Sequence, residues 1–164
     1  MSRLRGLSRT LFGSTSWNGI SLAAVALTGL LAFEGAAQDR KLVFQFHLIG
    51  AAATPDYGGV GMGLYRRAAG RLSYGATATA GTSAGRFTLR TEGMLLFNLD
   101  PGRQSGVAPY GGGGVVWRLV DDQSAGFLLI LVGIESAPAS SSGWFVELGV
   151  GAGLRGAVGW RTRR

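Results

Sequence analysis

The sequence of 164 residues contains no cysteine, one histidine and only nine acidic residues. The absence of cysteine excludes disulfides and thiolate metal sites. The single histidine, His47, has no further histidine or carboxylate at a metal-ligand spacing, so we expect no metal site and no cofactor. No GxSxG elbow occurs in the sequence, and Asp121 and Asp122 are adjacent in a polar turn, so we also expect no catalysis.

Long apolar runs are scarce as well, and the clearest one lies near the N-terminus. Residues 19–33 (GISLAAVALTGLLAF) follow three arginines, precede a small-residue site and are somewhat short for a membrane-spanning helix. This pattern predicts a signal peptide over residues 1–37, cut after Ala37, and a single domain over residues 38–164. An uncleaved N-terminal anchor is the alternative.

The formal charge is +7, from 16 basic and nine acidic residues. An excess of this size can indicate binding to nucleic acid or to an anionic membrane. The basic residues are spread along the chain, whereas nucleic-acid binding needs a basic patch or stripe. We therefore expect no nucleic acid as a partner.

Glycine is abundant, at 29 residues, and some stretches superficially resemble phosphate-binding loops. No predicted helix follows Gly111–Gly114 or Gly149–Gly153, and no GK[ST] motif occurs. Glycine within strands more readily permits tight curvature and close packing in a small barrel.

Alternation of apolar and polar residues is the dominant pattern after residue 40, and it predicts β-strands. The expected strands are 41–52, 57–67, 71–80, 86–98, 107–119, 126–135, 144–151 and 154–161. Their lengths are close to the roughly 9–11 residues that a tilted strand needs to cross a bilayer. In hydrocarbon only a closed sheet satisfies every backbone amide, so we expect an all-β, closed antiparallel up-and-down barrel of about eight strands.

The two faces of these strands differ in a way that favours a membrane barrel. One face carries Phe, Leu, Val, Met and Trp, and the other carries isolated charges that would be very costly to bury singly in a soluble core. The side chains expected to line the interior are Gln45, His47, Arg90, Glu92, Arg118, Glu147 and Arg155. An eight-stranded barrel is only wide enough for side chains to fill, so we expect a polar network that holds the barrel shut.

Four aromatic residues lie near strand ends, where membrane barrels place an interfacial girdle. The expected interfacial residues are Tyr57, Trp117, Trp144 and Trp160.

Two segments resemble a known family. Val107–Gly114 (VAPYGGGG) and Phe145–Gly153 (FVELGVGAG) are similar to the Pro-Tyr-x-Gly-x-Gly and Glu-x-Gly-x-Gly strands of the outer-membrane protein β-barrel domain family, the small OmpA-like and OmpX-like bacterial barrels. The resemblance implies periplasmic termini, location in the bacterial outer membrane, and roles in envelope integrity, adhesion or passage of small solutes. It implies no catalytic residues.

From the residues and the resemblance together, we expect a monomeric structural component of the cell envelope that is not an enzyme. Its expected partners are outer-membrane lipid and lipopolysaccharide, and the barrel-assembly machinery during biogenesis. The alternatives are a narrow channel for small solutes, a lipid-modifying enzyme that uses His47, and a soluble, lipocalin-like barrel that binds an apolar ligand.

Two features depart from the family pattern. Members commonly end in an aromatic residue that the assembly machinery reads, whereas Trp160 is followed by four further residues, so recognition uses Trp160 or the end is atypical. If the N-terminus is periplasmic, all outward loops are short and the longer links, 100–106 and 136–143, face the periplasm. That weakens an adhesin role, or else the strand count is off by one.

Overall fold

A computed structural model describes residues 42–164, apart from 69–70 and 122. The predicted signal peptide lies outside the described residues. The part of the chain that is described contains no helix long and apolar enough to cross a membrane. It contains eight strands: β1 (Leu42–Ala52), β2 (Tyr57–Arg67), β3 (Leu72–Ser83), β4 (Arg86–Asn98), β5 (Val107–Val120), β6 (Gln123–Ser136), β7 (Ser142–Val150) and β8 (Leu154–Arg163).

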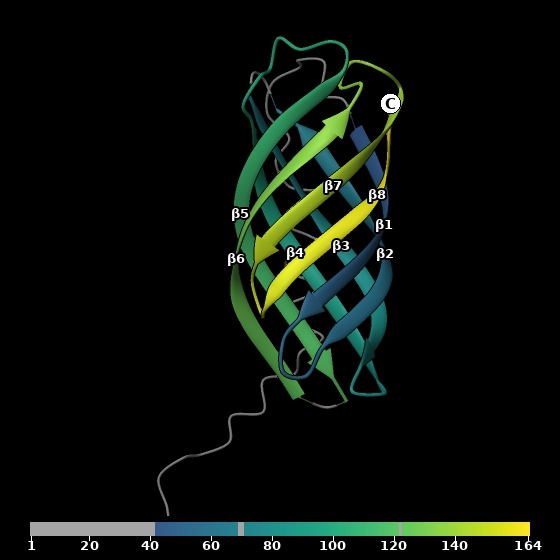
Figure 1. Cartoon of the computed structure of the whole chain (residues 1–164), viewed down its shortest axis with the longest axis vertical. Helices are drawn as coiled ribbons and strands as arrows, with labels where there is room; N and C mark the ends of the chain where they lie inside the picture. The colour runs from purple at the N-terminus through teal and green to yellow at the C-terminus, as the bar shows by residue number, and fades with distance from the viewer. Residues whose placement is uncertain (1–41, 69–70, 122) are drawn as a thin grey trace, which may run out of the picture.

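The strands form a closed antiparallel barrel, which confirms the predicted fold class (Figure 1). Each strand pairs with the next in the sequence, and β8 returns to pair with β1, from Val43↔Arg163 to Ala52↔Leu154. Closure pairs the first and last strands, so neither is left as a sheet edge. The predicted count of eight strands is correct.

Some strands run further than the alternation predicted. β3 continues to Ser83 because Ala84 and Gly85, with φ of 51° and 75°, form a two-residue turn directly between β3 and β4. β6 begins at Gln123 rather than Gly126, because polar residues at its start belong to the strand and not to a loop. Polarity alone does not mark the end of a strand at the rim of a barrel.

The two ends of the barrel differ. The terminal end, at the top of Figure 1, contains Leu42 and Arg164 and the longer connections 99–106 and 137–141. The turn end, at the bottom, contains the connections after β1, β3, β5 and β7, which have four residues or fewer. The prediction that the longer links, 100–106 and 136–143, lie at one end of the barrel is therefore correct, and that end contains Leu42 and Arg164.

The outward face is apolar and the inward face is polar. On β6, Leu128, Ile130 and Val132 point outward with 81%, 72% and 62% of their surface exposed, whereas the inward Arg90 and Arg155 are fully buried. This is the arrangement of membrane-spanning barrels. A lipocalin-like soluble barrel requires the opposite arrangement, so the structure contradicts that alternative.

One seam of the barrel is only partly paired. β6 pairs with β7 from Ile130↔Val150 to Glu135↔Phe145, whereas the pairing of β6 with β5 extends from Gln123 to Ser136. The residues of β6 from Gln123 to Leu129 thus extend beyond the β7 ladder, toward the turn end. The β5–β6 hairpin accordingly reaches further down than the β7–β8 hairpin (Figure 1).

Inward glycines make room for large interior side chains. A Cβ atom on Gly133 would lie 2.6 Å from Cζ of Tyr110, which is closer than carbon atoms approach. A Cβ on Gly61 would lie 2.8 Å from Nε2 of His47. At these positions glycine permits close packing across the lumen, in addition to any role in curvature.

Candidate functional site

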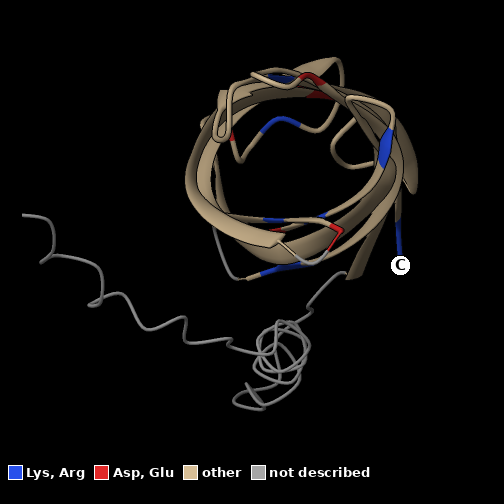
Figure 2. Cartoon of the chain, turned by 90° about the horizontal axis from the view of Figure 1, so that it is seen from below, with Lys and Arg blue, Asp and Glu red and all other residues tan. Residues whose placement is uncertain are grey.

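The interior of the barrel holds a continuous chain of arginines and glutamates. Figure 2 views the closed ring from the turn end, with basic and acidic positions distributed over several strands. Three buried carboxylates, on β4, β6 and β7, each join at least two arginines. We describe them in order from the turn end to the terminal end.

Glu92 on β4 is the first carboxylate. Arg90 Nε donates to its Oε1 over 2.7 Å, and Arg155 on β8 donates to both oxygens, over 3.1 and 2.9 Å. Arg90 Nη2 also donates to the carbonyl of Gly151, 3.3 Å away in the β7–β8 turn. The Arg90 side chain thus links β4 to β7–β8 across the interior.

Glu147 on β7 is the second carboxylate, and its side chain has no exposed surface. It accepts hydrogen bonds from Arg155 Nη1 over 2.9 Å, from Arg161 Nη2 over 2.8 Å and from the Tyr110 hydroxyl over 2.8 Å. Charge-assisted hydrogen bonds of this length are about twice as strong as neutral ones. Glu147 therefore connects Arg155 and Arg161 of β8 near the middle of the barrel.

Glu135 on β6 is the third carboxylate and lies nearest the terminal end. It accepts from Arg67 Nη2 over 2.9 Å, from Arg161 Nη1 over 3.1 Å and from Arg163 Nη2 over 2.9 Å. Arg161 thus touches two carboxylates, so the chain continues from Arg90 to Arg163 without a break.

Neutral polar groups extend this network across β1 and β3. Arg161 Nε donates to Gln45 Oε1 over 2.9 Å, and Gln45 Nε2 lies 3.2 Å from His47 Nδ1. His47 Nε2 lies 3.0 Å from Thr79 Oγ1. Because the Gln45 amide donates to Nδ1, the His47 proton belongs on Nε2, from which it is donated to Thr79. His47 is therefore occupied on both nitrogens and 5% exposed, an arrangement that fits a structural role.

Aromatic rings surround Arg161 and narrow the passage at this level. The guanidinium carbon lies 4.2 Å from the ring centre of Phe145, 4.8 Å from that of Tyr110 and 5.5 Å from that of Tyr65. These are cation–π distances. A cavity near Tyr65 and Arg161 measures about 20 Å³, which is enough for about one water molecule.

Six of the seven residues predicted for the interior are brought together: Gln45, His47, Arg90, Glu92, Glu147 and Arg155. Arg118 is the exception. It points inward at the turn end, is partly exposed, and lies 5.6 Å from the ring centre of Phe127. Among the described residues it forms no ion pair; Glu92 is paired with Arg90 and Arg155, and Asp121 at the turn end is paired with Arg86.

The sequence prediction of this ion-pair network omits Arg67, Glu135, Arg161 and Arg163. Glu135 ends a nearly continuous apolar run that hides the alternation. Arg161 is the last residue of the predicted strand 154–161 and Arg163 lies beyond it. Both have the same parity as Arg155, so following that parity to the end of β8 assigns them to the interior.

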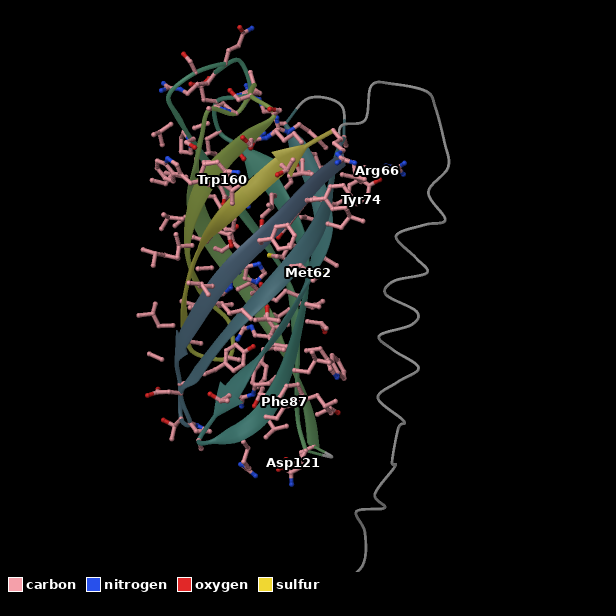
Figure 3. The ribbon with its side chains drawn as sticks, turned by 90° about the vertical axis from the view of Figure 1, so that its right-hand side faces the viewer. Met62, Arg66, Tyr74, Phe87, Asp121 and Trp160 are labelled. Carbon is pink, nitrogen blue, oxygen red and sulfur yellow. The ribbon has the colours of Figure 1, made fainter. Side chains whose placement is uncertain are left out.

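Three of the four predicted interfacial aromatics point outward, and one does not. Trp117, Trp144 and Trp160 are 38–50% exposed on the outer face. Tyr57 is wrong: it is 4% exposed, and its hydroxyl donates to the Thr79 carbonyl over 3.3 Å inside the barrel. Tyr74, which is partly exposed on β3, lies at the terminal end on the outward face (Figure 3).

No protein-family model and no curated protein matches the sequence. Solved structures do resemble the fold. The N-terminal β-barrel domain of OprF from Pseudomonas aeruginosa matches with a TM-score of 0.56 and 12% identity, covering 74% of this chain and 97% of that one. Neisserial surface protein A matches with a TM-score of 0.57 and 14% identity, covering 78% and 99%.

The outer-membrane protein OprG from Pseudomonas aeruginosa is a third match, with a TM-score of 0.56 and 11% identity over 79% of this chain and 98% of that one. At these identities the likeness concerns the fold alone. It agrees with the resemblance seen in the sequence motifs. The chain has the fold of the small eight-stranded outer-membrane β-barrels.

Proposed function

We propose that this protein is a small integral barrel of the bacterial outer membrane, with a structural role in the envelope and no catalytic activity. The observation that carries the proposal is the pairing of an apolar outer face with an interior filled by the chain of ion pairs from Arg90 to Arg163. An apolar exterior of this extent would be an aggregation liability in water. In a bilayer it faces lipid, and the charges remain paired inside.

The filled interior favours a closed barrel over the alternative of a narrow channel. Arg90, Arg155, Glu92 and Glu147 have side chains with no exposed surface, and Arg161 is ringed by aromatic side chains. A conducting path would have to break several charge-assisted hydrogen bonds, each contributing about 1.5–3 kcal/mol. Both ring nitrogens of His47 are engaged in hydrogen bonds, with Gln45 and Thr79, and this weighs against its use as a catalytic base.

Two measurements test the proposal. Fractionation of cells should place the protein with outer membranes, and unheated samples should migrate differently from boiled samples on gels because the barrel resists detergent. Planar-bilayer recordings of the refolded protein should show no steady conductance. A freely soluble periplasmic protein would refute the membrane location, and steady single-channel currents would refute the closed interior.

A further inference from the structure

An apolar groove crosses the outer surface of the barrel over five neighbouring strands, from β8 through β1, β2 and β3 to β4. Its volume is about 810 Å³. Outward side chains that line it are Phe46, Leu48, Val60, Met62, Ala78 and Trp160. The groove exists because β3 presents the small side chains of Ala76, Ala78 and Ala80 at this level, between the larger ones of β2 and β4.

A row of outward residues lies on the terminal-end side of this groove, four residues along each strand from the groove lining. Arg164 exchanges backbone hydrogen bonds with Leu42 over 2.8 and 2.9 Å, Leu42 pairs with Arg66, and Arg66 pairs with Tyr74. The four residues therefore lie side by side, with Arg164 directly after β8 and the others on β1, β2 and β3. Figure 3 shows Arg66 and Tyr74 together near the upper end, with Met62 below them.

The two arginines of this row have no acidic partner among the described residues. Neither the Arg66 nor the Arg164 side chain takes part in an ion pair or a hydrogen bond there. The outward positions of the four strands contain no Asp or Glu. By contrast, Arg103 at the same end donates to Asp100 over 2.8 Å. Among the described residues, positive charge without an acidic partner thus lies on the terminal-end side of the groove.

The spacing of the row and the groove matches one leaflet of a bilayer. Met62 lies four residues from Arg66 on β2, about 13 Å along the strand, or about 10 Å in depth at a tilt near 40°. Half of the hydrocarbon core is about 15 Å thick. Neighbouring strands are about 4.8 Å apart, so Arg164 and Arg66 are separated by roughly 10 Å and their long side chains can meet at one phosphate.

We propose that the row and the groove together bind one anionic glycerophospholipid molecule. Arg66 and Arg164 hold its phosphate, Tyr74 lies beside the headgroup, and the acyl chains occupy the groove past Met62. The groove offers an apolar surface for the paired acyl chains of a glycerophospholipid. This inference rests on the proposed membrane location of the barrel.

Trp160 lines the groove and reports on its occupant. In a full-length chain with Trp17, Trp117 and Trp144 replaced by phenylalanine, Trp160 is the only tryptophan. The protein is refolded into phosphatidylcholine vesicles that contain a small fraction of brominated phosphatidylglycerol or, separately, of brominated phosphatidylcholine. Bromine quenches tryptophan fluorescence on contact. A brominated lipid that binds in the groove therefore quenches Trp160 more strongly than its mole fraction in the bilayer predicts. We expect stronger quenching by phosphatidylglycerol.

Charge variants test whether the arginines supply this preference. Each of Arg66→Gln and Arg164→Gln should weaken the preference for phosphatidylglycerol about fivefold, because one basic residue near an anionic lipid contributes about that factor. The matched control is Arg103→Gln, which removes the same charge from the same end of the barrel and should leave the preference unchanged. Ala78→Phe fills the groove and should reduce quenching by both lipids at Trp160.

Each outcome decides the proposal. Equal quenching by the two lipids, or an effect of Arg103→Gln as large as that of Arg66→Gln, would show only general contact with the bilayer and would overturn it. Displacement of phosphatidylglycerol by lipopolysaccharide at equal concentration would assign the groove to the other lipid and overturn it too. If the chain inserts and is heat-modifiable but shows no preference, only this inference fails. If it does not insert, the proposed function fails as well.

Discussion

Replacing Glu147 by glutamine tests the energetic role of the buried network. The substitution keeps the shape of the side chain but removes a charge that accepts three hydrogen bonds, from Tyr110, Arg155 and Arg161. Removing one partner of a buried ion pair costs about 3–5 kcal/mol. Arg155 keeps its two bonds to Glu92, so we expect the lower end of this range, about 3 kcal/mol.

The assay is equilibrium urea unfolding of the refolded barrel in lipid vesicles, followed by tryptophan fluorescence. A loss of about 3 kcal/mol lowers the urea midpoint by at least about 1 M. The control is Asp121→Asn, which breaks the pair with Arg86, where both side chains are 59% exposed. An exposed ion pair contributes at most about 1 kcal/mol to the free energy of unfolding, so the urea midpoint of Asp121→Asn should move much less than that of Glu147→Gln.

A double variant separates charge balance from general damage to packing. Arg155→Met in the Glu147→Gln background removes a cation that has lost one of its two carboxylates, while Glu92 keeps Arg90. The double variant should therefore be more stable than the sum of the single effects predicts, by about 1 kcal/mol or more. Additive effects, or a Glu147→Gln midpoint no lower than that of Asp121→Asn, would refute the reasoning.

Two further expectations concern the filling of the lumen. Gly133→Ala should destabilise the barrel by about 1–3 kcal/mol in the same titration, because the new Cβ would lie 2.6 Å from Tyr110 Cζ. Gly50→Ala meets nothing within 4 Å and is the control, so equal midpoints would contradict the packing argument. Arg161→Ala removes the guanidinium group whose carbon lies 4.2 Å from the ring centre of Phe145. This opens the passage at that level, and the variant should show a small conductance in planar bilayers. Silent recordings from a correctly folded variant would show that Arg161 does not close the passage.

The sequence predicts the strands well because alternation is read two residues at a time and needs no knowledge of the partner strand. The same parity assigns Arg90 and Glu92 to the interior. Parity does not say which arginine meets which carboxylate. Glu92 on β4 and Arg155 on β8 meet only because the barrel closes and their side chains reach each other across the lumen.

The wrong face predicted for Tyr57 and the position of Arg118 outside the chain of ion pairs have a common cause. Tyr57 and Arg118 both lie near strand ends. The position of a residue along its strand gives its height in the barrel, whereas the alternation gives the face to which its side chain points. Tyr57 shares its parity with Gly59 and Gly61, whose missing side chains leave room for it inside. Arg118 has inward parity, but it lies opposite Arg90 on the turn-end side of Glu92, and that carboxylate is already paired with Arg90 and Arg155.

The partly paired seam between β6 and β7 has a consequence for the surrounding lipid. Its ladder spans only six residues, Ile130–Glu135, or about 20 Å along the strand and about 15 Å in height at a tilt near 40°. A typical apolar band is about 25 Å tall, and unpaired backbone groups cannot face hydrocarbon. We therefore expect the bilayer to be locally thinner beside β7 than elsewhere around the barrel, so that water or headgroups reach the free edge of β6 between Gln123 and Leu129.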